Sequence, residues 1–200
     1  MEIQLNEFQV SSFIESPISD VISSRRSLRA YSGQPVEQEK INSLFEAARW
    51  APSSMNEQPW TYVYATKDQP ELWSIIFETL NESNKIWAVN APLLVASFVR
   101  KKHLRNNQVN HSAKYDAGAA NAFLSLQATE LGLNVHQLGG YNREKLILSL
   151  NVPIEEFEPT VILAIGYPGD AELLPEHLKQ RELAPRNRYV QSSFVKNQVF

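Results

Sequence analysis

The sequence predicts an α+β fold, in which helical layers surround one β-sheet. Helical and extended patterns follow one another along its 200 residues, an order typical of a sheet covered by helices. Two predominantly apolar runs, residues 93–99 and 160–165, suit strands that are buried on both faces. The length fits one domain over residues 1–200, with an N-terminal extension at 1–17 and a C-terminal arm at 169–200.

The other elements follow from apolar periodicity and from residues that start or stop helices. Apolar side chains recur at helical spacing over residues 36–50, with Pro35 placed to start this helix and Pro52 to stop it. The predicted helices are 36–50, 70–80, 112–131 and 142–150, with a short helical pattern at Ile18, Val21 and Ile22 before them. The predicted strands are 61–65, 93–99, 135–138 and 160–165. The last strand is expected to end at Gly166, and the apolar arm after Pro168 to lie across another surface without a strand partner of its own.

Composition excludes several kinds of function. The balance of 19 Lys and Arg against 22 Asp and Glu gives a net charge of -3, which offers no reason to bind nucleic acid. Because the chain has no Cys, disulfides, thiolate nucleophiles and iron–sulfur clusters are excluded, and redox chemistry would need a bound organic cofactor. The four histidines form no short metal-binding pair, so no metal site is expected.

The sequence also bears on location. Its longest apolar stretch falls well short of the roughly 20 residues that span a bilayer. The first ten residues are acidic and polar, unlike a secretory signal. We therefore expect a cytoplasmic protein without a membrane partner.

Two short segments concentrate groups that bind phosphate. The cluster residues are Arg25, Arg26, Ser27 and Arg29 in one segment and Arg186 and Arg188 in the other. A guanidinium pairs bidentately with phosphate, and a serine hydroxyl can donate a further hydrogen bond. The alternative for the first segment is a solvated helix end whose cations complement the helix dipole. Convergence of both segments on one dianion would be the stronger signal.

Two loops are further candidates for binding. The loop at residues 51–60 is polar and stiffened by prolines, and it carries Pro52, Ser53, Ser54 and Asn56. The strand end Gln137, Leu138, Gly139 and Gly140 could lay bare backbone against a flat ligand, although a tight turn would use the same glycines. A basic run at residues 100–105 lacks aromatic residues and is interpreted as a solvated loop.

Five blocks in this order resemble the nitroreductase family of FMN-dependent oxidoreductases. The blocks are residues 25–29, 52–60, 84–92, 131–141 and 185–188, and together they extend from about residue 18 to 190. The resemblance implies a nitroreductase-like fold with a central mixed β-sheet covered by helices and an extended C-terminal tail that reaches a dimer partner. It also implies a homodimer with FMN at the subunit interface.

The resemblance further implies a role for each matching residue. Arg25, Ser27, Arg186 and Arg188 would hold the phosphate, with Arg26, Gln137 and Leu138 beside the cofactor. Arg29 would lie near the pyrimidine edge of the flavin and stabilise its reduced form electrostatically. Asn84 would bond that edge, with Asn81 as the alternative, and the backbone of Gly139 and Gly140 would face N5. Pro52, Ser53, Ser54 and Asn56 would complete the pocket from the other subunit.

The activity implied is reduction of nitroaromatic or quinone-like acceptors by NAD(P)H, through ping-pong hydride transfer at flavin N5. No catalytic side chain is expected, because the chemistry belongs to the flavin. The alternatives are the same scaffold acting on an enal, a small aldehyde or a halogenated ring, or a non-catalytic FMN-binding protein. Residues 100–115 match nothing in the family pattern, so the acceptor and the choice between NADH and NADPH stay open.

Overall fold

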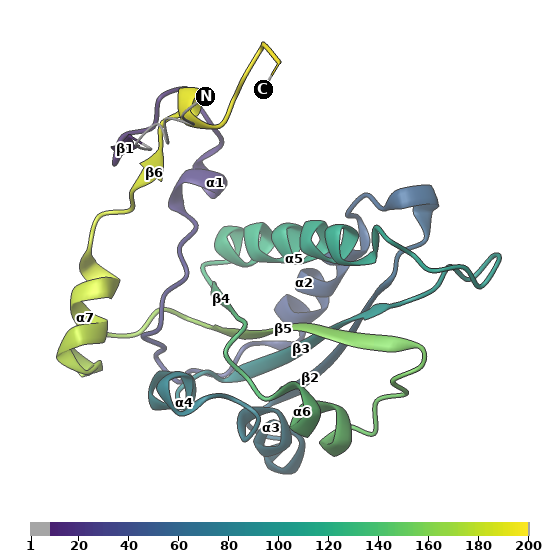
Figure 1. Ribbon diagram of the computed structural model, residues 1–200. Helices are drawn as coiled ribbons and strands as arrows, with labels where there is room; N and C mark the ends of the chain where they lie inside the picture. Colours follow the sequence, from purple (N-terminus) through teal and green to yellow (C-terminus); the bar gives the residue numbers. More distant parts are fainter. Residues whose placement is uncertain (1–8, 200) are drawn as a thin grey trace, which may run out of the picture.

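One four-stranded sheet, in the order β2-β3-β5-β4, organises the computed structural model, which describes residues 9–199 (Figure 1). The strands are β1 (Val10–Ser11), β2 (Trp60–Thr66), β3 (Leu93–Arg100), β4 (Asn134–Leu138), β5 (Phe157–Gly166) and β6 (Arg188–Tyr189). The helices are α1 (Asp20–Ser24), α2 (Gln38–Arg49), α3 (Pro70–Phe77), α4 (Glu82–Ala88), α5 (Ala113–Glu130), α6 (Arg143–Ser149) and α7 (Glu176–Leu183), with single 3-10 turns η1 (Ser54–Asn56), η2 (Ala171–Leu173) and η3 (Gln191–Ser193).

Helices cover both faces of the sheet, as expected for the predicted α+β arrangement, which is confirmed. Helices α2 and α5 lie on one face and α3, α4 and α6 on the other (Figure 1). Alternation along β3 explains the two layers, because Leu94 and Ala96 pack with Trp73 on the α3 side. Leu93 and Val95 point to the opposite face, toward α2 and α5. Both faces are therefore buried, which accounts for the predominantly apolar runs.

The expected mixed sheet is wrong for the described residues, because every neighbouring pair of its four strands is antiparallel. Strands β3 and β4 are parallel to each other, and α5 provides the crossover between them. They lie on opposite sides of β5 and do not pair. The order β3-α5-β4 thus does produce two parallel strands, but no hydrogen bonds of a parallel ladder join them.

Two helices were not predicted from the sequence. The seven residues of α4 are too few for a periodic pattern, and α3 ends at Phe77, before the predicted end at residue 80. Helix α7 is almost entirely polar and buries only Leu178 and Glu182. Such a helix has no apolar stripe from which it could be predicted.

The C-terminal arm also differs from expectation, because it has a strand partner of its own. Strand β6 pairs with β1 near the N-terminus, with Val10 opposite Tyr189 and Ser11 opposite Arg188. The paired segments extend beyond the sheet on the side of α1 and α7 (Figure 1). Residues 1–8 of the expected N-terminal extension lie outside the described residues. Over residues 9–199, no helix has both the length and the apolar content needed to cross a membrane.

Candidate functional site

The two arginine segments line one cavity of about 210 Å³. Its walls come from the segment after α1 and from α7 with the residues that follow it. The lining residues are Arg25, Arg26, Ser27, Leu28, Arg181, Glu182, Arg186 and Arg188. The structure therefore brings together cationic groups that are about 160 positions apart in the chain. Arg181 was not anticipated, because nothing in the sequence places α7 beside the first segment.

The arginines of the cavity differ in what their guanidinium groups contact. Arg186 donates hydrogen bonds to the carbonyl oxygens of Ser23 and Arg25. Arg26 donates to the carbonyls of Glu182, at 2.7 Å, and Ala184, at 3.0 Å. These two side chains tie the C-terminal arm to the first segment. Their positive charges remain at the cavity, because a carbonyl is a dipole and not a counter-ion.

Arg25 and Arg188 have more freedom toward the cavity. Arg25 donates to the hydroxyl oxygen of Ser27 at 3.2 Å, and Arg188 donates to the neighbouring carbonyl of Asn187 at 2.8 Å. Within residues 9–199, neither guanidinium forms a salt bridge with a carboxylate. Burial, and then the charge of Arg188, lowers the pKa of Arg25. Burial disfavours the charged form of Arg25, and the second effect reflects two positive charges held close together without an anion.

The pKa of Arg186 is lowered in the same way, first by burial and then by Arg188, Arg25 and Arg26. The mutual repulsion of these cations opposes folding unless a negative group enters the cavity. A phosphate monoester, which is close to a dianion at neutral pH, supplies that charge and several acceptor oxygens. The cavity therefore has the donor set and the charge of a phosphate site.

Glu182 holds the next part of the first segment. Its carboxylate is buried and accepts hydrogen bonds from the backbone N–H of Arg29, at 2.8 and 3.0 Å, and of Ala30, at 2.9 Å. It also lies 3.8 Å from Nη1 of Arg29. Glu182 could not be singled out from the sequence, because a glutamate in a polar helix ordinarily faces solvent.

His136 connects the same segment to β4. Its Nδ1 lies 3.2 Å from the carbonyl oxygen of Leu28, and its ring packs on Trp87 with 4.7 Å between ring centroids. Burial, and then the charge of Arg29, lowers the pKa of His136. The arginine segment and the end of β4 are thus held against each other.

The two glycines after β4 present bare backbone. Gly139 is exposed, and a Cβ built on it would have no atom within 4 Å. The carbonyl of Gly140 accepts from the side-chain amide of Asn84, at 2.9 Å, and from the backbone N–H of Asn81, at 3.0 Å. Both candidate asparagines therefore lie beside Gly140, and of the two it is Asn84 that donates through its side chain.

Gln137 and Leu138 differ in what they offer at the end of β4. Gln137 is exposed, although it donates its amide to the hydroxyl of Ser125 at 3.1 Å and to the carbonyl of Asn121 at 3.3 Å. Leu138 is buried in the core on the α3 side of the sheet. A ligand at the end of β4 could therefore contact the side chain of Gln137, but only the backbone of Leu138.

The loop that carries Pro52, Ser53, Ser54 and Asn56 lies at the opposite end of α5 from α1 and α7 (Figure 1). The structure therefore does not bring these four residues to the arginine cavity of the same chain. Met55, Asn56 and Gln58 have φ angles of 54°, 55° and 46°, the left-handed conformation that non-glycine residues seldom adopt. Ser54 donates its backbone N–H to buried Asp116 at 3.1 Å, which fixes the loop to α5.

Comparison with known proteins agrees with this arrangement. The family model described as the nitroreductase family matches residues 22–88. The FMN reductase (NAD(P)H) of Bacillus subtilis (strain 168) is 29% identical over 186 residues, covering 84% of this chain and 73% of that protein.

Two solved structures are similar over most of their length. A crystal structure of an oxidoreductase containing FMN has a TM-score of 0.88 and 33% identity, covering 94% of this chain and 95% of that one. A protein from Desulfovibrio desulfuricans, named as a nitroreductase in complex with FMN, has a TM-score of 0.66 and 25% identity, covering 82% and 95%. On the five ordered blocks, the matched model and this agreement over nearly the whole fold, the chain belongs to the nitroreductase family.

Proposed function

We propose that this chain is an FMN-dependent oxidoreductase that uses NAD(P)H to reduce nitroaromatic or quinone-like acceptors. The observation that carries the proposal is the cavity where two distant basic segments meet, with Arg25, Arg186 and Arg188 around it. The relatives named above, an FMN reductase and two FMN-containing structures, support the choice of cofactor.

The phosphate of FMN fits the cavity for reasons of charge and donors. Arg25 and Arg188 would bind its oxygens directly, with the hydroxyl of Ser27 as a further donor, while Arg26 and Arg186 keep the two segments joined. Each hydrogen bond between charged groups contributes about 1.5–3 kcal/mol to binding. Burial first, and then the repulsion of neighbouring arginines, lowers the pKa of Arg25 and Arg186, and the negative charge of the phosphate would oppose both effects.

The flavin ring would lie against the exposed backbone at Gly139, with Asn84 and Arg29 at its pyrimidine edge. Bound FMN supplies the chemistry, since it accepts a hydride from a nicotinamide and passes two electrons to an acceptor. The role of Arg29 is to hold a fixed positive charge beside that edge. Glu182 orients Arg29 and offsets part of its charge, because its carboxylate lies 3.8 Å from the guanidinium.

A homodimer would complete the site. The loop with Ser53, Ser54 and Asn56 lies too far from the arginine cavity of its own chain, so a twin chain would have to supply it. Exposed apolar side chains on the paired termini and on α5, such as Phe13, Tyr115 and Phe194, supply apolar surface for the contact.

We further propose that residues 1–200 form one domain, because both apolar layers share a single sheet. The cytoplasm is the location that suits the activity, since its NAD(P)H pool supplies the donor.

A visible spectrum of the purified protein tests the proposal, followed by anaerobic titration with NADH and with NADPH. We expect a flavin absorption band that either donor bleaches. Arg25→Ala should weaken FMN binding about ten- to a hundredfold, and Lys67→Ala, an exposed lysine in the turn between β2 and α3, should leave it unchanged. A protein that stays colourless after FMN is added would rule the function out. Bound flavin that neither donor bleaches would favour a non-catalytic binding protein.

A further inference from the structure

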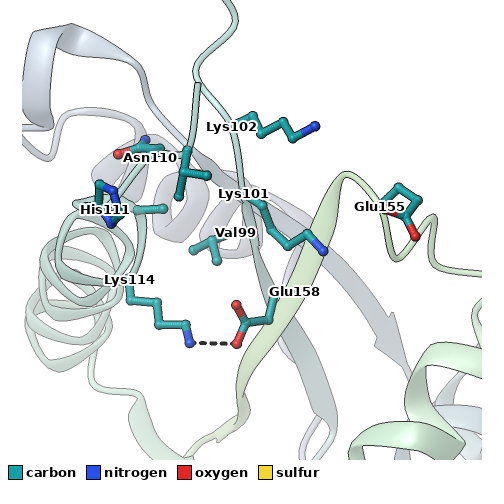
Figure 2. Close-up of a pocket in the computed structure, with 10 residues that line it drawn as sticks. Val99, Lys101, Lys102, Asn110, His111, Lys114, Glu155 and Glu158 are labelled. Atoms are coloured by element: carbon teal, nitrogen blue, oxygen red, sulfur yellow. Dashed lines mark ion pairs between the residues drawn. The ribbon is translucent and has the colours of Figure 1, made fainter. Parts of the chain in front are cut away.

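A second cavity, of about 450 Å³, lies at the other end of the sheet from the arginine cavity (Figure 2). It is enclosed by the end of β3, the hairpin at residues 102–109, the start of α5 and the start of β5. Backbone hydrogen bonds fix its walls, since Lys101 donates its N–H to the carbonyl of Glu156 and accepts from the N–H of Asn110, both at 2.8 Å. The cavity is thus preformed, and its volume lies within the range of small-molecule sites.

The charge around this cavity is positive. Glu158 is matched twice, by Lys114 at 2.6 Å and by Arg143 at 3.5 Å (Figure 2). Lys101 and Lys102 also line the cavity, and within residues 9–199 neither ammonium has a carboxylate within 4.0 Å. Glu155 is a second carboxylate of the lining, so Lys101, Lys102 and Lys114 exceed the two glutamates by one positive charge, which is available to an incoming anion.

The floor of the cavity is apolar. Val99 and Ala113 are buried there, and Val109 adds an exposed apolar side chain at the rim. Each partly exposed ammonium contributes little to binding a bare anion, because water screens the attraction. A ligand with an apolar body and one anionic group would use both the floor and the rim.

The hairpin that forms one wall is tied to the loop at residues 52–59. The nearly buried carboxylate of Glu57 accepts the backbone N–H of Leu104 at 3.1 Å and lies 3.4 Å from Nε of Arg105. Under the proposed function, that loop covers the flavin of the partner subunit. The lysines of the cavity would then stand beside the path by which an acceptor reaches the partner's flavin.

We propose that this cavity binds the carboxylate of the electron acceptor, with Lys101 and Lys102 as its counter-ions. The preferred acceptors would be nitroaromatic or quinone compounds that carry a carboxylate. This inference rests on the proposed function, because only that function makes the ligand an electron acceptor. The binding of an aromatic acid to the cavity can nevertheless be measured without turnover.

The test compares 4-nitrobenzoate with 4-nitrobenzamide, which has the same shape and no charge. In Lys101→Gln and Lys102→Gln, kcat/KM for 4-nitrobenzoate should fall up to about fivefold for each lysine. The value for 4-nitrobenzamide should stay within about twofold. Lys67→Gln, remote from both cavities, is the matched control. Equilibrium dialysis of 4-nitrobenzoate with oxidised protein, without a donor, should show the same loss of binding.

A variant with both Lys101→Gln and Lys102→Gln decides the inference. An unchanged ratio of its two kcat/KM values would overturn the inference, and so would an equal loss with both acceptors. A rise in KM confined to NADPH, with the acceptor ratio unchanged, would also overturn it and assign the lysines to the 2′-phosphate of the donor. If the protein fails to bind FMN, the proposed function fails; the dialysis then decides separately whether the cavity binds an aromatic acid.

Discussion

Glu182→Gln is the substitution that best probes how the site is held together. The carboxylate of Glu182 accepts from the backbone N–H of both Arg29 and Ala30 and pairs with the guanidinium of Arg29. Glutamine has the same shape and keeps one acceptor oxygen. Its amide group, however, presents N–H donors toward a backbone N–H, and the negative charge beside Arg29 is lost.

The expected cost follows from the burial of these groups. The side chain of Glu182 is 5% exposed and that of Arg29 17%, so solvent replaces little of what is lost. A hydrogen bond to a charged group is worth about 1.5–3 kcal/mol, and removing one partner of a buried pair costs about 3–5 kcal/mol. We expect the free energy of unfolding to fall by about 2–4 kcal/mol, because the retained oxygen still accepts one bond. For a chain of this size the melting temperature should drop by about 4–16 °C.

Denaturant unfolding of the FMN-free protein, at fixed protein concentration, measures this loss. Glu172→Gln is the control, because Glu172 forms an exposed pair with Lys179 on the same arm. If the protein binds flavin as proposed, the midpoint potential should also rise in Glu182→Gln, since the unopposed charge of Arg29 favours the anionic reduced form. Equal stability of wild type and Glu182→Gln would refute the reasoning. An unchanged midpoint potential would show that Arg29 does not lie beside the flavin.

Three further predictions concern positions nearby. Gly139→Ala should leave the unfolding midpoint unchanged, because no atom lies within 4 Å of the new Cβ, and yet weaken FMN binding; equal FMN affinity would move the ring elsewhere. Gly169→Ala should destabilise the fold by about 1–3 kcal/mol, since its Cβ would lie 2.4 Å from the backbone carbon of Tyr31; a normal denaturant midpoint would contradict this. Folding lowers the pKa of His136, so the unfolded chain binds more protons just below pH 6.5, and stability should fall as the pH drops through that value. His136→Gln should flatten this dependence and His177→Gln, at an exposed position, should not; identical pH profiles would exclude the burial effect.

The elements that could be predicted from sequence are those in which the order of apolar and polar side chains follows from which of them are buried. The four sheet strands and helices α2, α3, α5 and α6 each have an apolar pattern set by what they pack against. Helices α4 and α7 lack such a pattern, and the pairing of β1 with β6 joins segments of two residues. The antiparallel order could not be inferred either, since it depends on β5 inserting between β3 and β4.

At the arginine cavity, the cationic residues could be predicted from the sequence, but the different contacts that each of them makes could not. Arg25 and Arg186 look equivalent in sequence, since both belong to short basic segments. In the structure Arg186 donates to two backbone carbonyls, whereas the guanidinium of Arg25 donates to the hydroxyl of Ser27. The difference arises because the arm folds back on the first segment, and no local pattern encodes that approach.

The residues that position the site could not be predicted from the sequence, because they are acidic residues whose burial no local pattern indicates. Glu182, Asp116 and Glu57 are buried or nearly buried carboxylates that accept backbone N–H groups from segments far away in the chain. Glu182 holds the arginine segment, Asp116 the loop with Ser54, and Glu57 the hairpin beside the second cavity. A carboxylate in a polar helix or loop is indistinguishable by composition from one that faces water. These anchors bind main-chain donors, so they fix each loop without occupying the side chains that would contact a ligand. A chain whose glycines form no glycine-rich phosphate loop can thus still present rigid binding segments to a ligand.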